Sequence, residues 1–128
     1  MIREAVPREL APKPGNILCV GRAEELLSLR GLVLHGAGYQ VIEERDVTRA
    51  IQLGFQETTG LVLLCHTLHS DEQHRIIHAL RTSRPHLPIA CVIAVDHHST
   101  PAGSLAVNSD PQRLIEAIHK IFRQLRSQ

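Results

Sequence analysis

The sequence predicts an α/β fold, a doubly wound sheet of five parallel strands with helices on both faces. After residue 15, short continuous apolar runs alternate with segments of helical periodicity. This alternation is typical of βαβ units. The apolar runs lack polar alternation, as expected of strands buried on both faces. Right-handed crossovers then favour the strand order 2-1-3-4-5.

The first fifteen residues lack this pattern. They contain Pro7, Pro12, Pro14 and Gly15, and proline disrupts both helix interiors and central strands. We therefore expect a flexible tail over residues 1–15 and a single domain over residues 16–126. The 128-residue chain is long enough for one core without disulfides.

The elements follow from the order of the apolar residues. We expect strands at residues 17–20, 40–43, 61–65, 89–95 and 105–107. Helices are expected at 24–37, from a cap at Asp46 or Thr48 to about 57, at 70–83 and from 111 to about 125. In the first helix, Leu26, Leu29, Val33 and Ala37 recur at helical spacing and predict its buried face. The inward residues expected of the later helices are Ala50, Ile51 and Leu53, then Ile76, Ile77 and Leu80, then Leu114, Ile118 and Ile121 or Phe122.

Capping residues set the expected starts of the helices. Asp46 or Thr48 can cap the second helix. Ser70 followed by Gln73 is a capping-box pattern for the third. Asp110 before Pro111 predicts an N-cap followed by proline at the first helical position of the last.

Composition argues against several partners. The net charge is +1, which gives no electrostatic reason for binding nucleic acid or an anionic membrane. Trp is absent, with one Tyr and two Phe, so no aromatic platform is available for stacking bases. No apolar run reaches the length of a membrane span, and no apolar signal core follows Met1. The odd number of cysteines, Cys19, Cys65 and Cys91, suggests a reducing compartment. We expect a cytoplasmic protein.

Several stretches resemble CheY-like response-regulator receiver domains. They are residues 17–20, 36–41, 61–64, 85–89 and 110–111, in the family's order and spacing, and the resemblance covers roughly residues 16 to 125. It implies a stand-alone receiver-like protein of bacterial two-component phosphorelay signalling, with the flavodoxin-like strand order 2-1-3-4-5.

The residues that carry receiver chemistry are all changed. At the positions of the acidic pair, the phosphoacceptor aspartate, the switch hydroxyl and the lysine stand Gly21 and Arg22, Cys65, Ile93 or Ala94, and Val107. Phosphoryl transfer to a carboxylate needs a bound cation, and Mg²⁺ needs oxygen ligands. We therefore expect a degenerate, pseudo-receiver site that does not take up phosphate.

A receiver's fourth helix has no room here. Only nine residues, 96–104, separate the expected end of the fourth strand at Val95 from Leu105, and they include Pro101 and Gly103. So short a link with proline and glycine predicts that the fourth helix is shortened or missing.

A metal site is the alternative interpretation. Cys65, His66 and His69 follow the third strand, and Asp96, His97 and His98 follow the fourth. Neighbouring parallel strands end at one edge, where ligands of such sheets bind, and zinc takes cysteine and histidine. Solvated loop histidines are the simpler explanation, and we expect the other five, His35, His74, His78, His86 and His119, at the surface. Cys65 is also expected to be a buried apolar residue rather than a nucleophile.

The expected function is a phosphorylation-independent protein-interaction module without enzymatic activity or a cofactor. The alternative is a metal- or anion-binding protein, with zinc as the metal. Arg22 could hold an anion, but a salt bridge with Asp96 or Glu24 is expected. Output would pass through a protein partner or self-association, using the strand-end loops and the last helix, whose exposed charges are expected at Arg113, Glu116, Lys120 and Arg123.

Overall fold

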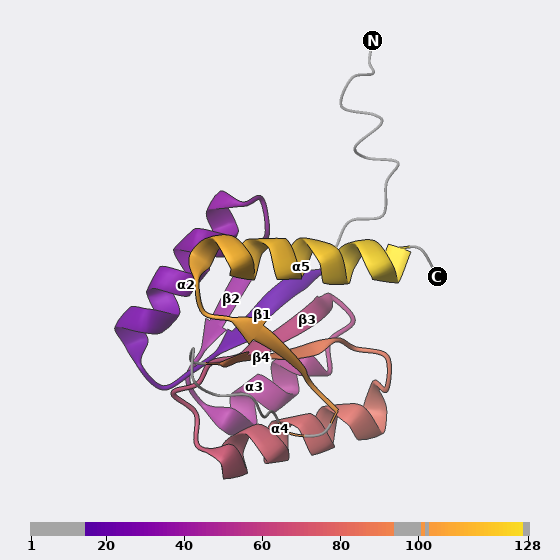
Figure 1. The fold of residues 1–128 in the computed structure, drawn as a ribbon. Helices are drawn as coiled ribbons and strands as arrows, with labels where there is room; N and C mark the ends of the chain where they lie inside the picture. Colours follow the sequence, from indigo (N-terminus) through magenta and orange to yellow (C-terminus); the bar gives the residue numbers. More distant parts are fainter. Residues whose placement is uncertain (1–14, 94–100, 102, 127–128) are drawn as a thin grey trace.

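A computed structural model describes residues 15–93, 101 and 103–126 of the chain. Within these residues lies one five-stranded sheet in the order β2-β1-β3-β4-β5, and all neighbouring strands are parallel. The strands are β1 (Asn16–Val20), β2 (Val41–Glu44), β3 (Thr59–Leu64), β4 (Ile89–Ile93) and β5 (Leu105–Asn108). The predicted fold class and strand order are confirmed (Figure 1).

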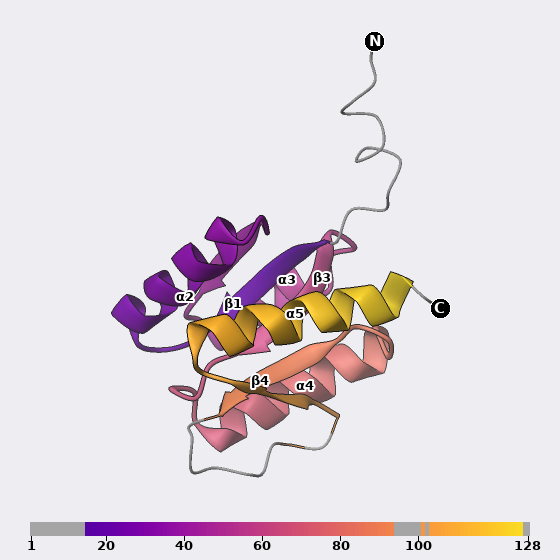
Figure 2. The ribbon, with the colours of Figure 1, turned by 45° about the horizontal axis from the view of Figure 1, so that its top comes forward.

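Helices cover both faces of this sheet. Their bounds are α2 (Glu24–Gly36), α3 (Val47–Gly54), α4 (Ser70–Ser83) and α5 (Pro111–Arg126). The helices α2 and α5 lie on one face, and α3 and α4 lie on the other (Figures 1 and 2). Each face has its own apolar cluster, one under α2 and α5 and one under α3 and α4. None of the helices in this described part is long and apolar enough to cross a membrane.

The strands β1 and β3 form the buried centre. Every residue from Ile17 to Val20 is fully buried, as the continuous apolar runs predict. Because side chains alternate across a strand, Cys19 and Leu63 face α2 and α5, while Leu18 and Leu64 face α3 and α4. The parallel register sets Cys19 opposite Leu63.

The predicted buried face of the first helix is wrong. Leu29 is 55% exposed, whereas α2 buries Leu27, Arg30, Gly31 and Leu34. Leucines lie all around this helix, so their spacing alone did not distinguish the faces. The inward residues expected of α4 are confirmed, and α5 buries Leu114, Ile118 and Phe122, with Ile121 partly buried. Of those expected of α3, Ala50 is buried, while Ile51 and Leu53 are partly buried.

The helix caps bring two confirmations and two corrections. Pro111 begins α5 as predicted, and the carboxylate of Asp110 accepts the backbone N–H of Arg113 at 3.2 Å. The carboxylate of Asp46 accepts the backbone N–H of Arg49 at 2.8 Å and caps α3. This helix ends at Gly54 instead of continuing to residue 57. In α4 the capping box is formed by His69 and Glu72, one residue before the predicted pair. This position of the capping box determines where the Glu72 carboxylate lies.

The far edge of the sheet is thinly covered. Leu105 in β5 is 50% exposed, and Ala106 is exposed beside Cys91 of β4. Residues 94–100 and 102 of the link lie outside the described part, and the described residues 101, 103 and 104 are not helical. The guanidinium of Arg81 on α4 donates to the Gly103 carbonyl at 2.8 Å, which fastens the end of the link to α4. The tail predicted over residues 1–15 also lies outside the described residues, except Gly15.

Candidate functional site

The carboxyl ends of β1 and β3 bring three predicted site residues together. Gly21 follows β1, and Cys65 follows β3, where its N–H donates to the Val20 carbonyl at 2.8 Å. A Cβ atom at Gly21 would lie 3.0 Å from the Cβ of Cys65 and 3.2 Å from its sulfur. Glycine therefore permits this close approach, since a larger residue would need the Cys65 side chain to move. Arg22 completes the group, its N–H bonded to the Thr67 hydroxyl at 3.0 Å.

Arg22 and Glu72 form an ion pair across this edge. The Arg22 Nε donates to Glu72 Oε1 at 2.9 Å, and Nη2 bonds the second carboxylate oxygen. Two parallel bonds of this kind fix both position and orientation. The predicted pairing of Arg22 with Glu24 is wrong, because Glu24 lies 3.6 Å from Arg45 instead. The other predicted partner, Asp96, lies outside the described residues.

The same carboxylate also serves the helix cap. Glu72 Oε1 accepts the backbone N–H of His69 at 2.9 Å. The bond from Arg22, followed by that from His69, lowers the pKa of Glu72 from 4.5 to about 2. The oxygens of Glu72 are thus already committed to a cation and an amide. Sequence reasoning missed Glu72; its place three residues after the capping His69 was the available signal.

Ile93 and Val107 make the adjoining part of the edge apolar. In the register of β4 and β5, Val107 lies opposite Val92, and Ile93 lies opposite Asn108. Val107 is buried in the cluster under α2 and α5, while Ile93 ends β4 and is half-buried. Neither side chain carries a hydroxyl or amine that could contact a phosphoryl group.

A pair of thiols lies just beneath the edge. Cys65 and Cys19 are 1% and 0% exposed, and their sulfur atoms are 3.9 Å apart. The hydrogen bond between them lowers the pKa of Cys65 to about 7, with burial opposing and the charge of Arg30 adding to the lowering. The same hydrogen bond and burial raise the pKa of Cys19 well above its usual value.

Arg30 is the charged residue beside these thiols. It is only 5% exposed, and its Nη1 has no hydrogen-bond partner among the described residues. Sequence reasoning missed Arg30 because the wrong face of α2 was taken as buried. It also missed the pairing of Cys19 with Cys65. The signal was that both cysteines fall on the same face of neighbouring strands.

The predicted metal ligands do not gather in the part of the chain that the structure describes. His66 and His69 are exposed, and the ring of His69 accepts a backbone N–H of α4 in the capping box. Residues 15–93, 101 and 103–126 contain no group of three or more His, Cys, Asp or Glu that could hold a metal ion. His97 and His98 lie outside the described residues.

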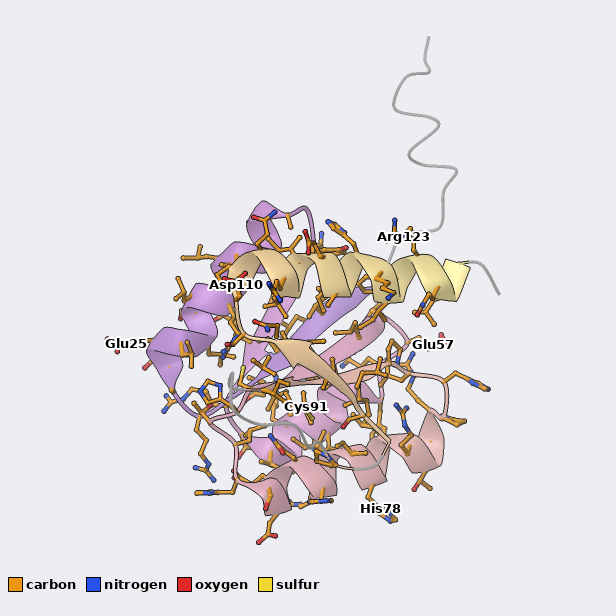
Figure 3. The ribbon with its side chains drawn as sticks, viewed as in Figure 1. Glu25, Glu57, His78, Cys91, Asp110 and Arg123 are labelled. Atoms are coloured by element: carbon orange, nitrogen blue, oxygen red, sulfur yellow. The ribbon has the colours of Figure 1, made fainter. Side chains whose placement is uncertain are left out.

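The outer sides of the helices carry the remaining candidate residues. Arg113, Glu116, Lys120 and Arg123 are exposed on α5, and Figure 3 shows Arg123 on the outer side of this helix. The five histidines expected at the surface, His35, His74, His78, His86 and His119, are exposed. On α4, His78 points away from the sheet (Figure 3).

Solved receiver domains share this fold. A putative response regulator from Chloroflexus aurantiacus is 21% identical, with a TM-score of 0.71, and the match covers 85% of this chain and 98% of that one. A response regulator receiver protein from Sinorhizobium medicae is 16% identical, with a TM-score of 0.70 and coverage of 87% and 96%. A CheY-like receiver domain protein from Methanospirillum hungatei is 15% identical, with a TM-score of 0.69 and coverage of 90% and 98%.

Sequence comparison adds no closer relative. No protein-family model matches the chain, and no curated protein does. At these identities the structural likeness concerns the architecture. The chain therefore has the fold of a response-regulator receiver domain.

Proposed function

We propose that this protein is a receiver-like signalling protein that lacks a phosphoacceptor and acts as a phosphorylation-independent protein-interaction module. One observation carries the proposal: Arg22, bound through two nitrogens to Glu72, lies at the strand edge directly after Gly21, which lies against Cys65. A Mg²⁺-dependent phosphoryl transfer needs free oxygen ligands at such an edge. The described edge offers a guanidinium, a glycine and a buried thiol.

The helical layer of α2 and α5 supplies a surface for a protein partner. On α2, Leu29 and Leu32 are 55% and 69% exposed, one turn apart. A hollow next to Arg22 is lined by Ala23, Glu24, Glu25, Leu26 and Leu29. On α5, the exposed Arg113, Glu116 and Lys120 add charges of both signs. Apolar contacts bordered by charges suit a protein partner, because interfaces combine an apolar centre with a polar rim.

Partner binding can be tested with surface variants. We would capture crosslinked partners of the full chain in cells of its source, and measure self-association of the purified chain by sedimentation. Arg113→Glu with Lys120→Glu, or Leu29→Ser with Leu32→Ser, should abolish the captured contact. His78→Glu on the outer side of α4 is the matched control and should keep it. A monomer without a partner, or binding that requires a phosphodonor and Mg²⁺, would contradict the proposal.

A further inference from the structure

We propose that Cys19 and Cys65 form a redox-active dithiol that hydrogen peroxide oxidises to a disulfide, with the buried Arg30 as the activating cation. The proposal is independent of the partner surface, so either can fail without the other. It rests on the placement of two thiols under the carboxyl ends of β1 and β3, beside a buried guanidinium whose Nη1 has no hydrogen-bond partner among the described residues.

The sheet itself brings the sulfur atoms together. The register pairs Cys19 with Leu63 and Val20 with Leu64, so Cys65 follows one residue later on the same face as Cys19. The sulfurs are 3.9 Å apart, and a disulfide requires about 2 Å. Cys65 lies beyond the last residue of β3, Leu64, where the chain enters a turn. It can therefore approach Cys19 without breaking the central pairing of β1 and β3.

Arg30 requires an anion at this place. An arginine keeps its charge in proteins, and a buried charge is costly unless it is paired. Arg30 is 5% exposed, and its Nη1 is unpartnered in the described part of the chain. The acidic candidate Glu43, opposite Cys19 on β2, is exposed and reaches over Gly31 of α2. The Cys65 thiolate is thus the buried anion that suits Arg30.

The two thiols consequently take different roles. The pKa of Cys65 is lowered to about 7 by the hydrogen bond with Cys19, with Arg30 contributing. About half of the Cys65 side chains are then thiolate at neutral pH, and the thiolate is the reactive form. Cys19, whose pKa is raised, keeps its proton and donates it to the thiolate.

The oxidation balances with hydrogen peroxide as the oxidant. The Cys65 thiolate attacks one peroxide oxygen, the O–O bond breaks, and hydroxide leaves to give a sulfenic acid. The sulfur of Cys19 then attacks the Cys65 sulfur, the S–O bond breaks, and the hydroxyl leaves with the Cys19 proton as water. Together with the proton released by Cys65, two thiols and one peroxide give one disulfide and two waters. Peroxide is small, and Gly21, which lies against Cys65, has no side chain at this contact.

Cys91 provides the internal control. It is 2% exposed, lies in the other apolar cluster, and contacts the Ser104 hydroxyl at 3.5 Å. Burial raises the pKa of its thiol. Equal burial without a second sulfur or a guanidinium should leave Cys91 reduced.

The test is peroxide titration of the reduced full chain, followed by intact mass and peptide mapping. We expect the loss of two hydrogens per chain and a Cys19–Cys65 crosslink. Cys91→Ser should leave this unchanged, whereas Cys65→Ser and Cys19→Ser should abolish the crosslink. Arg30→Met should slow oxidation at neutral pH, because it removes the positive charge that contributes to lowering the pKa of Cys65 and so reduces the thiolate fraction.

Two further readouts keep the proposal falsifiable if Arg30→Met does not fold. The first is the Arg30→Lys variant, which retains the positive charge. The second is the pH dependence of thiolate absorbance in the unmodified chain, which should show one thiol ionising near neutral pH. Oxidation of Cys91 at the same rate as Cys65, sulfenic acid at Cys65 without a crosslink, or three thiols unchanged by peroxide would each overturn the proposal.

Discussion

The centre of the sheet and its β4–β5 edge are covered very differently. At the centre, the closed half, β1 and β3 are buried on both faces, Gly21 lies against Cys65, and Arg22 is bound to Glu72 where the strands end. At the β4–β5 end, Leu105 and Ala106 are exposed, and a link too short for a full helix follows β4. Among the described residues, the closed half is therefore buried on both faces, whereas the open half leaves part of β5 exposed.

The largest contrast should come from removing a leucine in each half. Leu63 is fully buried and Leu105 is 50% exposed, so Leu63→Ala should cost about 2–5 kcal/mol of unfolding free energy. Leu105→Ala should cost less than about 1 kcal/mol, since surface changes have small effects. Urea denaturation of both variants measures the difference. Equal losses would show that the two halves are covered alike.

Enlarging a small residue gives the next contrast. A Cβ at Gly54 would lie 2.7 Å from a methyl carbon of Leu80, so Gly54→Ala should cost about 1–3 kcal/mol through overpacking. In the open half, Ala106→Leu should change stability by less than about 0.5 kcal/mol, as is usual for exposed sites. Thermal unfolding of the two variants measures which of them loses more stability. A loss for Ala106→Leu as large as that for Gly54→Ala would contradict the open-edge description.

The Arg22–Glu72 ion pair should have the smallest effect on the free energy of unfolding, and this effect should appear at acid pH. Because the folded-state pKa of Glu72 is about 2, below its usual 4.5, its carboxylate stabilises the folded state above pH 4.5. This contribution is lost as the pH falls from 4.5 towards 2. Screening keeps it modest, since the Arg22 side chain is 55% exposed.

Glu72→Gln should therefore flatten the acid limb of the stability profile. Glu24→Gln is the matched control, because Glu24 is 75% exposed and 3.6 Å from Arg45. Denaturant midpoints measured across the acid range distinguish the two. If both variants keep the profile of the unmodified chain, the Arg22–Glu72 pair does not stabilise the edge.

Much of the fold could be predicted because its signals are local. The buried strands appear as continuous apolar runs, and the inward residues of α4 appear as Ile76, Ile77 and Leu80. The buried face of α2 could not be predicted, because leucines surround that helix and the buried side includes Arg30. Tertiary packing decides such a case, and periodicity does not.

The positions of the site residues could be predicted better than the residues that they contact. Gly21, Arg22 and Cys65 follow strands that end at one edge, so their proximity follows from topology. The partner of Arg22 could not be predicted, because the capping box lies one residue earlier than expected. Its second member is therefore Glu72, whose carboxylate binds Arg22. The pairing of Cys19 with Cys65 depends on the register of β1 against β3. This register can be predicted only when the ends of both strands are known to the residue.

The most direct test of the central claim is intact-mass measurement of the full chain after incubation with a small-molecule phosphodonor and Mg²⁺. The account predicts no phosphoryl adduct, because the described part of the strand edge presents Arg22, Gly21 and Cys65, and its Glu72 carboxylate is bound to Arg22. A receiver domain of known structure that does take up a phosphoryl group serves as the positive control under the same conditions. A stoichiometric phosphoryl adduct that maps to the strand-end residues would contradict the account.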